Sequence, residues 1–153
     1  MNTIDLLKSL TTAVGVSGAE NSVTDLLKGL LSSYGSVTVD NLGNVYCKIG
    51  DKGPHILIDA HIDEIGFIVK EITADGFIKV SNIGGIDRRM LLSAEVSVWG
   101  DREYRGVIST LPPHLQKKDD ERKAPEIDEI AIDVGMTKEQ AEECISLGDR
   151  VTF

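Results

Sequence analysis

The residues with the strongest chemical character lie in the segment His55-Ile-Leu-Ile-Asp-Ala-His-Ile-Asp-Glu-Ile-Gly66. His61 and Asp63 follow the apolar run Ile56-Leu57-Ile58, and α/β proteins gather functional groups at the ends of buried strands. Side chains two residues apart share one face of a strand, so His61 and Asp63 can touch. A carboxylate behind a histidine fixes the tautomer and orientation of the ring, and the neutral ring nitrogen suits zinc or cobalt. From spacing alone, a purely structural hydrogen bond is the more frequent meaning of such a pair.

Glu64 adjoins Asp63 and raises the alternative of a catalytic carboxylate pair. Glycosidase chemistry needs two carboxyl groups about 5–9 Å apart that converge on one bond. Neighbouring residues of a strand point to opposite faces. The spacing therefore disfavours this pair unless the strand ends at His61.

The other histidines and the two cysteines are weaker candidates. We expect His55 to lie at the surface, and His114, in a loop fixed by Pro112-Pro113, to serve packing or a subunit contact. Cys47 is expected to be a small buried strand residue. Cys144 lies in a helix without the basic partner that marks a reactive thiolate. The sequence contains no phosphate-binding loop, dinucleotide fingerprint or nucleophile elbow.

Composition narrows the class of protein. The chain has 153 residues, 41% hydrophobic and 27% charged, with a net charge of −9. That negative charge argues against binding to nucleic acid or anionic membranes. Two cysteines are too few for a disulfide scaffold or a cysteine-based zinc site, and no apolar stretch is long enough for a membrane span. Asp5 lies where a signal peptide would be positive, so we expect a cytoplasmic protein.

The elements that must position His61 are predicted by periodicity. Apolar residues at helical spacing predict a helix over residues 3–14 and a second helix whose apolar stripe runs from Val23 to Leu31 and which stops at Gly35. Ser17 with Glu20 forms a capping-box pattern at the start of the second helix. Two strands, 37–39 and 45–49, are expected around the turn Asn41–Asn44. The unbroken run 56–58 predicts a strand covered on both faces.

From Gly66 onward the pattern changes to short strands. Asp75-Gly76 is a strong hairpin signal. A capped helix is predicted at 138–146, after Thr137 and Gln140. The predicted strands are 66–72, 77–81, 96–99, 104–110, 129–133 and 150–153. They suggest a small barrel or sandwich, separate from the sheet before Gly66. The charged stretch Gln116–Pro125 is expected to be a solvated loop or surface helix. Because the sequence stops on the apolar Val151-Thr152-Phe153, we expect it to be cut.

Several motifs, in order, resemble the tetrahedral (TET-type) metallo-aminopeptidases. This family includes glutamyl aminopeptidases, and some of its members carry the label endoglucanase or cellulase M. The similarity runs from end to end of the chain. The motifs are Val16-Ser-Gly-Ala-Glu20, Asp40-Asn-Leu-Gly-Asn44, Asp59-Ala-His61-Ile-Asp63-Glu64-Ile-Gly66, Asp75-Gly-Phe77, Ile83-Gly-Gly-Ile-Asp87, Pro112-Pro-His-Leu115, Ile132-Asp-Val-Gly135 and Gly148-Asp-Arg-Val-Thr-Phe153.

This resemblance implies an α/β zinc-peptidase-type fragment, with helices packed on a mixed sheet, and an inserted small all-β barrel-like module. It implies that residues 1–66 belong to the peptidase domain, 67–150 to the inserted dimerisation module, and 151–153 to the return into the peptidase domain. His61 matches a metal ligand and Asp63 the catalytic-site carboxylate that orients it. The remaining ligands and the general-base Glu of the family lie beyond Phe153.

By the same resemblance, the complete enzyme would use two divalent metal ions, zinc or cobalt with manganese as a further option, to remove N-terminal residues from peptides. It would assemble as a homo-oligomer, a dodecamer in the family, through the β module. This chain alone would hold at most one ion weakly and would be inactive. The alternatives are a non-catalytic oligomerisation or regulatory module, and the endoglucanase that the label suggests. The preferred N-terminal residue and the native metal stay open.

Overall fold

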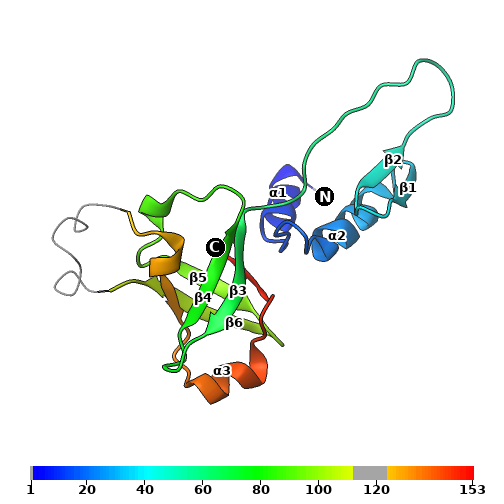
Figure 1. Ribbon diagram of the computed structural model, residues 1–153. Helices are drawn as coiled ribbons and strands as arrows, with labels where there is room; N and C mark the ends of the chain where they lie inside the picture. Colours follow the sequence, from blue (N-terminus) through cyan, green and yellow to red (C-terminus); the bar gives the residue numbers. More distant parts are fainter. Residues whose placement is uncertain (1, 112–123) are drawn as a thin grey trace. The chain divides into compact units, whose positions relative to one another are not determined.

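The computed structural model describes residues 2–111 and 124–153, and the chain divides into two compact units, Met1–Glu64 and Ile65–Phe153. The described part of the first unit contains two helices and one hairpin, which Figure 1 labels. Its elements are α1 (Thr3–Thr11), α2 (Asn21–Leu31), β1 (Ser36–Val39) and β2 (Val45–Lys48). The helices and strands predicted for these regions are present, and α1 ends three residues earlier than predicted.

The starts of the two helices differ. Asn2 caps α1, because its side-chain oxygen accepts a hydrogen bond from the Asp5 amide at 2.9 Å. The helix α2 has no side-chain cap, so the predicted capping box of Ser17 and Glu20 is wrong. The Glu20 carboxylate accepts from the Gly18 amide instead, and the Ser17 hydroxyl donates to a carboxylate far along the chain.

The hairpin of β1 and β2 turns between Val39 and Val45, a segment that contains the predicted turn Asn41–Asn44. The Asp40 carboxylate accepts hydrogen bonds from the amides of Leu42 and Asn44 at 2.9 and 3.0 Å, and from the Asn44 side chain at 2.8 Å. Gly43 has a φ of +88°, which a residue without Cβ adopts at little cost. α2 packs against both strands.

The expected buried strand at 56–58 is wrong. Ile56, Leu57 and Ile58 have no regular structure, and they are 82–91% exposed. A strand forms where neighbours accept its hydrogen bonds, and no strand in the described part of the chain pairs with this segment. In the first unit the described strands form a two-stranded antiparallel sheet, and the parallel pairing there is an isolated bridge between Val16 and Glu64.

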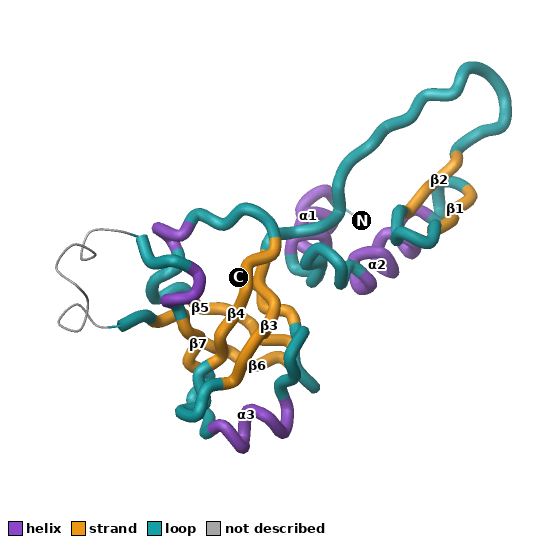
Figure 2. The backbone as a smooth tube through the Cα atoms, viewed as in Figure 1, coloured by secondary structure: helices purple, strands orange, loops and turns teal. Residues whose placement is uncertain are grey.

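The second unit is a closed six-stranded barrel in the order β3-β4-β7-β6-β5-β8, and the strand pairs are antiparallel (Figure 2). The strands are β3 (Gly66–Ile72), β4 (Ile78–Ile83), β5 (Glu95–Trp99), β6 (Glu103–Ser109), β7 (Ala131–Asp133) and β8 (Arg150–Thr152). The predicted closed β module, separate from the first sheet, is therefore confirmed, as is the fold class.

Alternate strand residues fill the barrel. Its core combines Phe67, Val80, Val98, Ile132 and Val151, which are at most 1% exposed, with further apolar side chains of the same unit. This alternation of buried and exposed residues is the pattern expected of strands with one face on a core.

Short helical segments complete the barrel unit. They are η1 (Arg88–Met90), η3 (Ile127–Glu129) and α3 (Lys138–Cys144). The capping box at α3 is confirmed, since Thr137 and Gln140 bond to each other's backbone amides. α3 ends two residues before the predicted boundary. The strand expected from Glu129 begins at Ala131, because η3 occupies the preceding residues. Most of Gln116–Pro125 lies outside the described residues.

The last strand completes the barrel. β8 pairs with β3 and β5, with Val151 buried between them, while the expected domain boundaries stay a prediction. In the closed barrel each described strand has a hydrogen-bonded neighbour on both sides, although β4 and β7 pair only at Ile78 and Ile132.

Among the described residues, none of the helices has the length and apolar character needed to cross a membrane.

Candidate functional site

His61 and Asp63 lie together in the loop that ends the first unit. The His61 Nδ1 atom lies 3.0 Å from the Asp63 carbonyl oxygen and 3.1 Å from Asp63 Oδ1. Both neighbours are acceptors, so Nδ1 carries the hydrogen and Nε2 is the ring atom with a free lone pair. The His61 side chain is 86% exposed, which leaves Nε2 accessible. The contact that spacing predicted is present, although it forms in a loop and not on a strand.

Asp63 is held from its other side by Ser17. The Ser17 hydroxyl donates a hydrogen bond to Asp63 Oδ2, while Oδ1 faces the imidazole. The Ser17 hydrogen bond, followed by the one to His61, lowers the pKa of the Asp63 carboxyl below its usual 3.8. Asp63 is therefore a carboxylate at neutral pH, and it favours the Nδ1–H form of the ring.

Glu64 has different partners and does not join this group. Its Oε1 accepts from the Gly15 amide at 3.0 Å, and its own amide donates to the Gly15 carbonyl at 2.8 Å. Each of the two adjacent carboxylates is thus committed to a separate hydrogen bond. Because these residues do not lie on a strand, the alternation argument against a glycosidase pair does not apply, and it is their separate hydrogen-bond partners that disfavour such a pair.

The backbone of residues 15–17 is fastened to residue 64. Val16 forms a parallel bridge with Glu64, and the Ser17 amide donates to the Glu64 carbonyl at 3.4 Å. Val16 is fully buried. Gly15 is required here, because a Cβ on it would lie 2.5 Å from Val23 Cγ2 and 3.4 Å from the Ile62 carbonyl oxygen. These contacts place the Ser17 hydroxyl at the Asp63 carboxylate.

The other candidates do not join the site. His55 is exposed, as expected, and His114 with Pro112-Pro113 lies outside the described residues. Cys47, which we expected to be buried, is half-buried, and its Sγ is 3.7 Å from the Leu31 carbonyl. Cys144, at the end of α3, lies 3.3 Å from the Gln140 carbonyl and belongs to the other unit.

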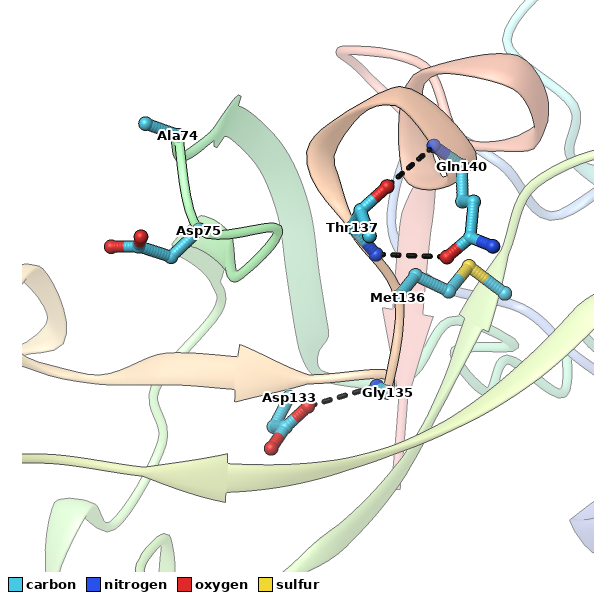
Figure 3. A pocket seen from close by; sticks show the side chains of 7 residues that line it. All are labelled: Ala74, Asp75, Asp133, Gly135, Met136, Thr137 and Gln140. Atoms are coloured by element: carbon cyan, nitrogen blue, oxygen red, sulfur yellow. Dashed lines mark hydrogen bonds between the residues drawn. The ribbon is translucent and has the colours of Figure 1, made fainter.

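A shallow pocket of about 380 Å³ lies in the barrel unit, between the β3–β4 turn and the start of α3 (Figure 3). Its polar groups are engaged locally: Thr137 and Gln140 cap α3, and Asp133 accepts from the Gly135 amide at 2.8 Å. In Figure 3 the carboxylates of Asp75 and Asp133 do not point toward one another. This pocket therefore lacks a convergent set of chemical groups.

A metal ion would need more ligands than these residues bring together. Within residues 2–111 and 124–153, no group of three or more His, Cys, Asp and Glu side chains is arranged to hold an ion. The donor chemistry of His61 fits one bond to zinc or cobalt, because an exposed neutral Nε2 is backed by a carboxylate at Nδ1.

Ser17 is the residue that sequence reasoning missed. Its place before Glu20 made a helix cap the simplest local explanation, whereas its real partner is 46 residues away. A signal was available, because Ser17 lies in the motif Val16-Ser-Gly-Ala-Glu20 that resembles the aminopeptidases.

Comparisons with known proteins give a consistent result. Residues 43–153 match the family described as M42 glutamyl aminopeptidase. The lysyl aminopeptidase of Pyrococcus furiosus is 34% identical over 144 residues, which cover 91% of this chain and 42% of the relative.

Solved structures of the same kind match nearly the whole chain. A TET aminopeptidase from a marine sediment Thaumarchaeota archaeon is 35% identical with a TM-score of 0.91, over 97% of this chain and 44% of that one. The Pyrococcus horikoshii TET1 peptidase, described as assembling into a tetrahedron or a large octahedral shell, is 32% identical with a TM-score of 0.87, over 99% and 46%. A Thermotoga maritima protein described as an endoglucanase is 32% identical with a TM-score of 0.79, over 96% and 44%. The chain thus spans less than half the length of the proteins it matches.

Proposed function

Because this chain belongs to the M42 glutamyl aminopeptidase family, we propose that it forms part of a metal-dependent aminopeptidase that removes N-terminal residues from peptides. The proposed metal site is supported by the contact between Asp63 and His61 Nδ1, which leaves Nε2 free at an exposed position. His61 is the proposed metal ligand, and Asp63 the carboxylate that orients it.

The proposed reaction is water attack at a two-metal site. Two bound divalent ions, zinc or cobalt with manganese as a further option, would polarise the scissile carbonyl and lower the pKa of a water molecule. The part assigned to this chain is limited to holding one ion through His61. Asp63 keeps the imidazole in the Nδ1–H form, so that Nε2 is the atom available to the ion. We propose that the further ligands and a general-base Glu come from the part of the family's sequence that this chain does not span.

The first experiment is to sequence the gene downstream of the Phe153 codon and translate the reading frame. We expect it to encode the missing ligands: an Asp-Asp-Arg segment, a Glu-Glu pair and a late His. The complete product is expected to hydrolyse amino-acid p-nitroanilides with zinc or cobalt. His61→Ala should abolish this turnover, while His55→Ala, a change of the same kind at another exposed histidine, should preserve it. Full activity in His61→Ala would reject the assigned ligand.

A stop codon directly after Phe153 would instead support the second candidate, a non-catalytic oligomerisation or regulatory module. One observation favours that candidate. The barrel unit contains a closed core, whereas in the first unit the buried apolar residues are Val16 and Val23. The endoglucanase alternative has no such support, because the Asp63 and Glu64 carboxylates have separate partners.

We also propose that the barrel unit mediates self-association. Leu91 is fully buried and anchors the segment after η1, so its neighbours Met90 and Leu92 are held outward, 76% and 47% exposed. The assembling Pyrococcus horikoshii peptidase contains a matching region. The expected contact at Pro112–Leu115 lies outside the described residues, and it stays a prediction.

Sedimentation velocity tests this surface. Met90→Asp together with Leu92→Asp should lower the association constant, because a buried charge is costly at an apolar contact. Leu147→Asp, at a comparably exposed residue of the same unit, should leave association unchanged. A wild-type chain that stays monomeric at high concentration would contradict the proposal.

The proposed location is the cytoplasm. Cys47 and Cys144 are both free thiols, which is the usual state in a reducing compartment.

A further inference from the structure

The imidazole of His61 has little packing to hold it. Its side chain is 86% exposed, and the contacts that orient the ring are those of Nδ1 with Asp63. The Asp63 side chain is itself 42% exposed, so burial alone does not fix its rotamer. The orientation of His61 therefore depends on whatever holds the Asp63 carboxylate.

Ser17 supplies that restraint. Its hydroxyl donates to Asp63 Oδ2 and leaves Oδ1 on the imidazole, so the two carboxylate oxygens have one partner each. If the hydroxyl were absent, Oδ2 would lose this donor and the carboxylate could rotate away from His61. The ring would then keep only the Asp63 carbonyl as a neighbour of Nδ1.

Ser17 is well suited to this task because its backbone is fixed independently of its side chain. The Val16–Glu64 bridge and the hydrogen bond from the Ser17 amide to the Glu64 carbonyl tie the two segments together. Gly18, with a φ of +82°, allows a turn in which the Ala19 amide donates to the Val16 carbonyl at 2.8 Å. The hydroxyl is thus delivered to Asp63 by a turn anchored on a buried valine.

We propose that Ser17 is a positioning residue for His61: it locks the Asp63 carboxylate so that the imidazole stays in the Nδ1–H form, with Nε2 directed outward. This inference rests on the proposed function for its meaning, since a fixed Nε2 is what a metal ligand requires. The geometry itself, a chain from Ser17 through Asp63 to His61, does not depend on a metal.

The tautomer of His61 is the quantity to measure. Long-range ¹H–¹⁵N NMR spectra of the metal-free 153-residue chain, recorded at a pH where histidine is neutral, report which ring nitrogen carries the hydrogen. We expect the Nδ1–H form to dominate in the wild type. In Ser17→Ala the ratio of the Nδ1–H to the Nε2–H form should fall about twofold or more, the size expected for coupled neighbours. Ser17→Thr retains a hydroxyl and should restore the wild-type ratio.

A double-mutant cycle separates positioning from a general structural effect. If Ser17 acts through Asp63, then Ser17→Ala should have no further effect on the tautomer in an Asp63→Ala background. Ser33→Ala is the control, because the Ser33 hydroxyl also donates a hydrogen bond, to the Leu30 carbonyl, but from an exposed position that does not touch Asp63. An unchanged tautomer in Ser17→Ala would overturn the proposal. So would an equal effect in the Asp63→Ala background, or the same shift in Ser33→Ala.

The measurement contains no metal, so it is independent of the proposed function. A positive tautomer result combined with full activity of His61→Ala in the complete enzyme would refute the metal-ligand assignment and leave Ser17 as the residue that orients the imidazole. An unchanged tautomer ratio in Ser17→Ala combined with loss of activity in His61→Ala would refute the role of Ser17 and support His61 as a metal ligand.

Discussion

Gly15 leaves little room for a side chain beside the site. A Cβ there would meet the Val23 side chain at 2.5 Å, and Val23 is buried beside the loop that holds Ser17. Gly15→Ala is therefore expected to lower the stability of the first unit by about 1–3 kcal/mol, the usual cost of overpacking. Hydrogen exchange of the Ser17 and Glu64 amides would detect the loosening.

Gly29 provides the control for this substitution. It lies inside α2, and a Cβ there would meet no atom within 4 Å. Gly29→Ala should stabilise the helix by about 0.5–1 kcal/mol, because alanine loses less backbone entropy on folding. Equal effects of the two changes on amide exchange would contradict the steric argument at Gly15.

The pKa of the Tyr104 phenol gives a second prediction at the scale of single residues. Its hydroxyl donates to Asp101 Oδ1 at 2.6 Å, and this bond, followed by one with Cys144 and by burial, raises the pKa of the phenol from 10.0 to about 12. The neutral phenol thus contributes to folding stability below pH 10, and this contribution is lost as the pH rises through about 12. Asp101→Asn should bring the pKa down toward 10.

Ultraviolet absorbance of tyrosinate during alkaline titration measures this pKa, and Tyr104→Phe identifies the transition that belongs to Tyr104. Asp51→Asn removes a carboxylate at an exposed position of the other unit and should leave the transition in place. A Tyr104 transition near 10 in the wild type would show that the phenol is not held neutral by Asp101.

Among the elements, β8 joins β3 to β5 and so closes the barrel. It is three residues long, yet it pairs with β3 and β5, and Val151 is opposite Phe67 and Val98. Val151→Ala removes two buried methyl groups, so the free energy of unfolding should fall by about 2 kcal/mol. Trp99 is the single tryptophan and donates to Thr152 Oγ1 at 2.9 Å, so its fluorescence during urea unfolding reports on this region.

Val107→Ala is the matched control. Val107 lies in β6 of the same barrel but is 43% exposed, and its truncation should change the free energy of unfolding by less than about 0.5 kcal/mol. If the two alanine variants unfold at the same urea concentration, then β8 is not part of the cooperative core.

The barrel elements could be predicted because their information is local. Asp75-Gly76 specifies a hairpin through the positive φ of Gly76, and Thr137 with Gln140 caps α3 from within four residues. The strand predicted at residues 56–58 does not form, because a strand also needs neighbouring strands to accept its hydrogen bonds. The apolar pattern of the sequence does not show whether such neighbours are present. The candidate site divides in the same way. The His61–Asp63 contact is short in sequence and was predicted, whereas Ser17 depends on a contact across the whole first unit.

At the scale of the whole molecule, the two units differ in how much of their apolar surface they bury. The closed barrel covers its own core, while the first unit leaves Ile56, Leu57 and Ile58 in contact with solvent. An exposed apolar run of this kind is unusual for a finished domain. The unit that carries His61 is therefore the one whose described residues are least self-sufficient, and this has a direct consequence for activity.

We predict that this 153-residue chain alone has no appreciable aminopeptidase activity. A two-metal site needs ligands for both ions and a positioned base, with the ions about 3.5–4 Å apart. Within the part of the chain that the structure describes, no three ligand side chains gather, and Asp63 is occupied by Ser17 and His61. An ion held by one imidazole would have neither fixed geometry nor protection from water. The purified chain should therefore not hydrolyse amino-acid p-nitroanilides, with or without added zinc or cobalt. Metal-dependent turnover that disappears in His61→Ala would show that other residues of this chain complete the site.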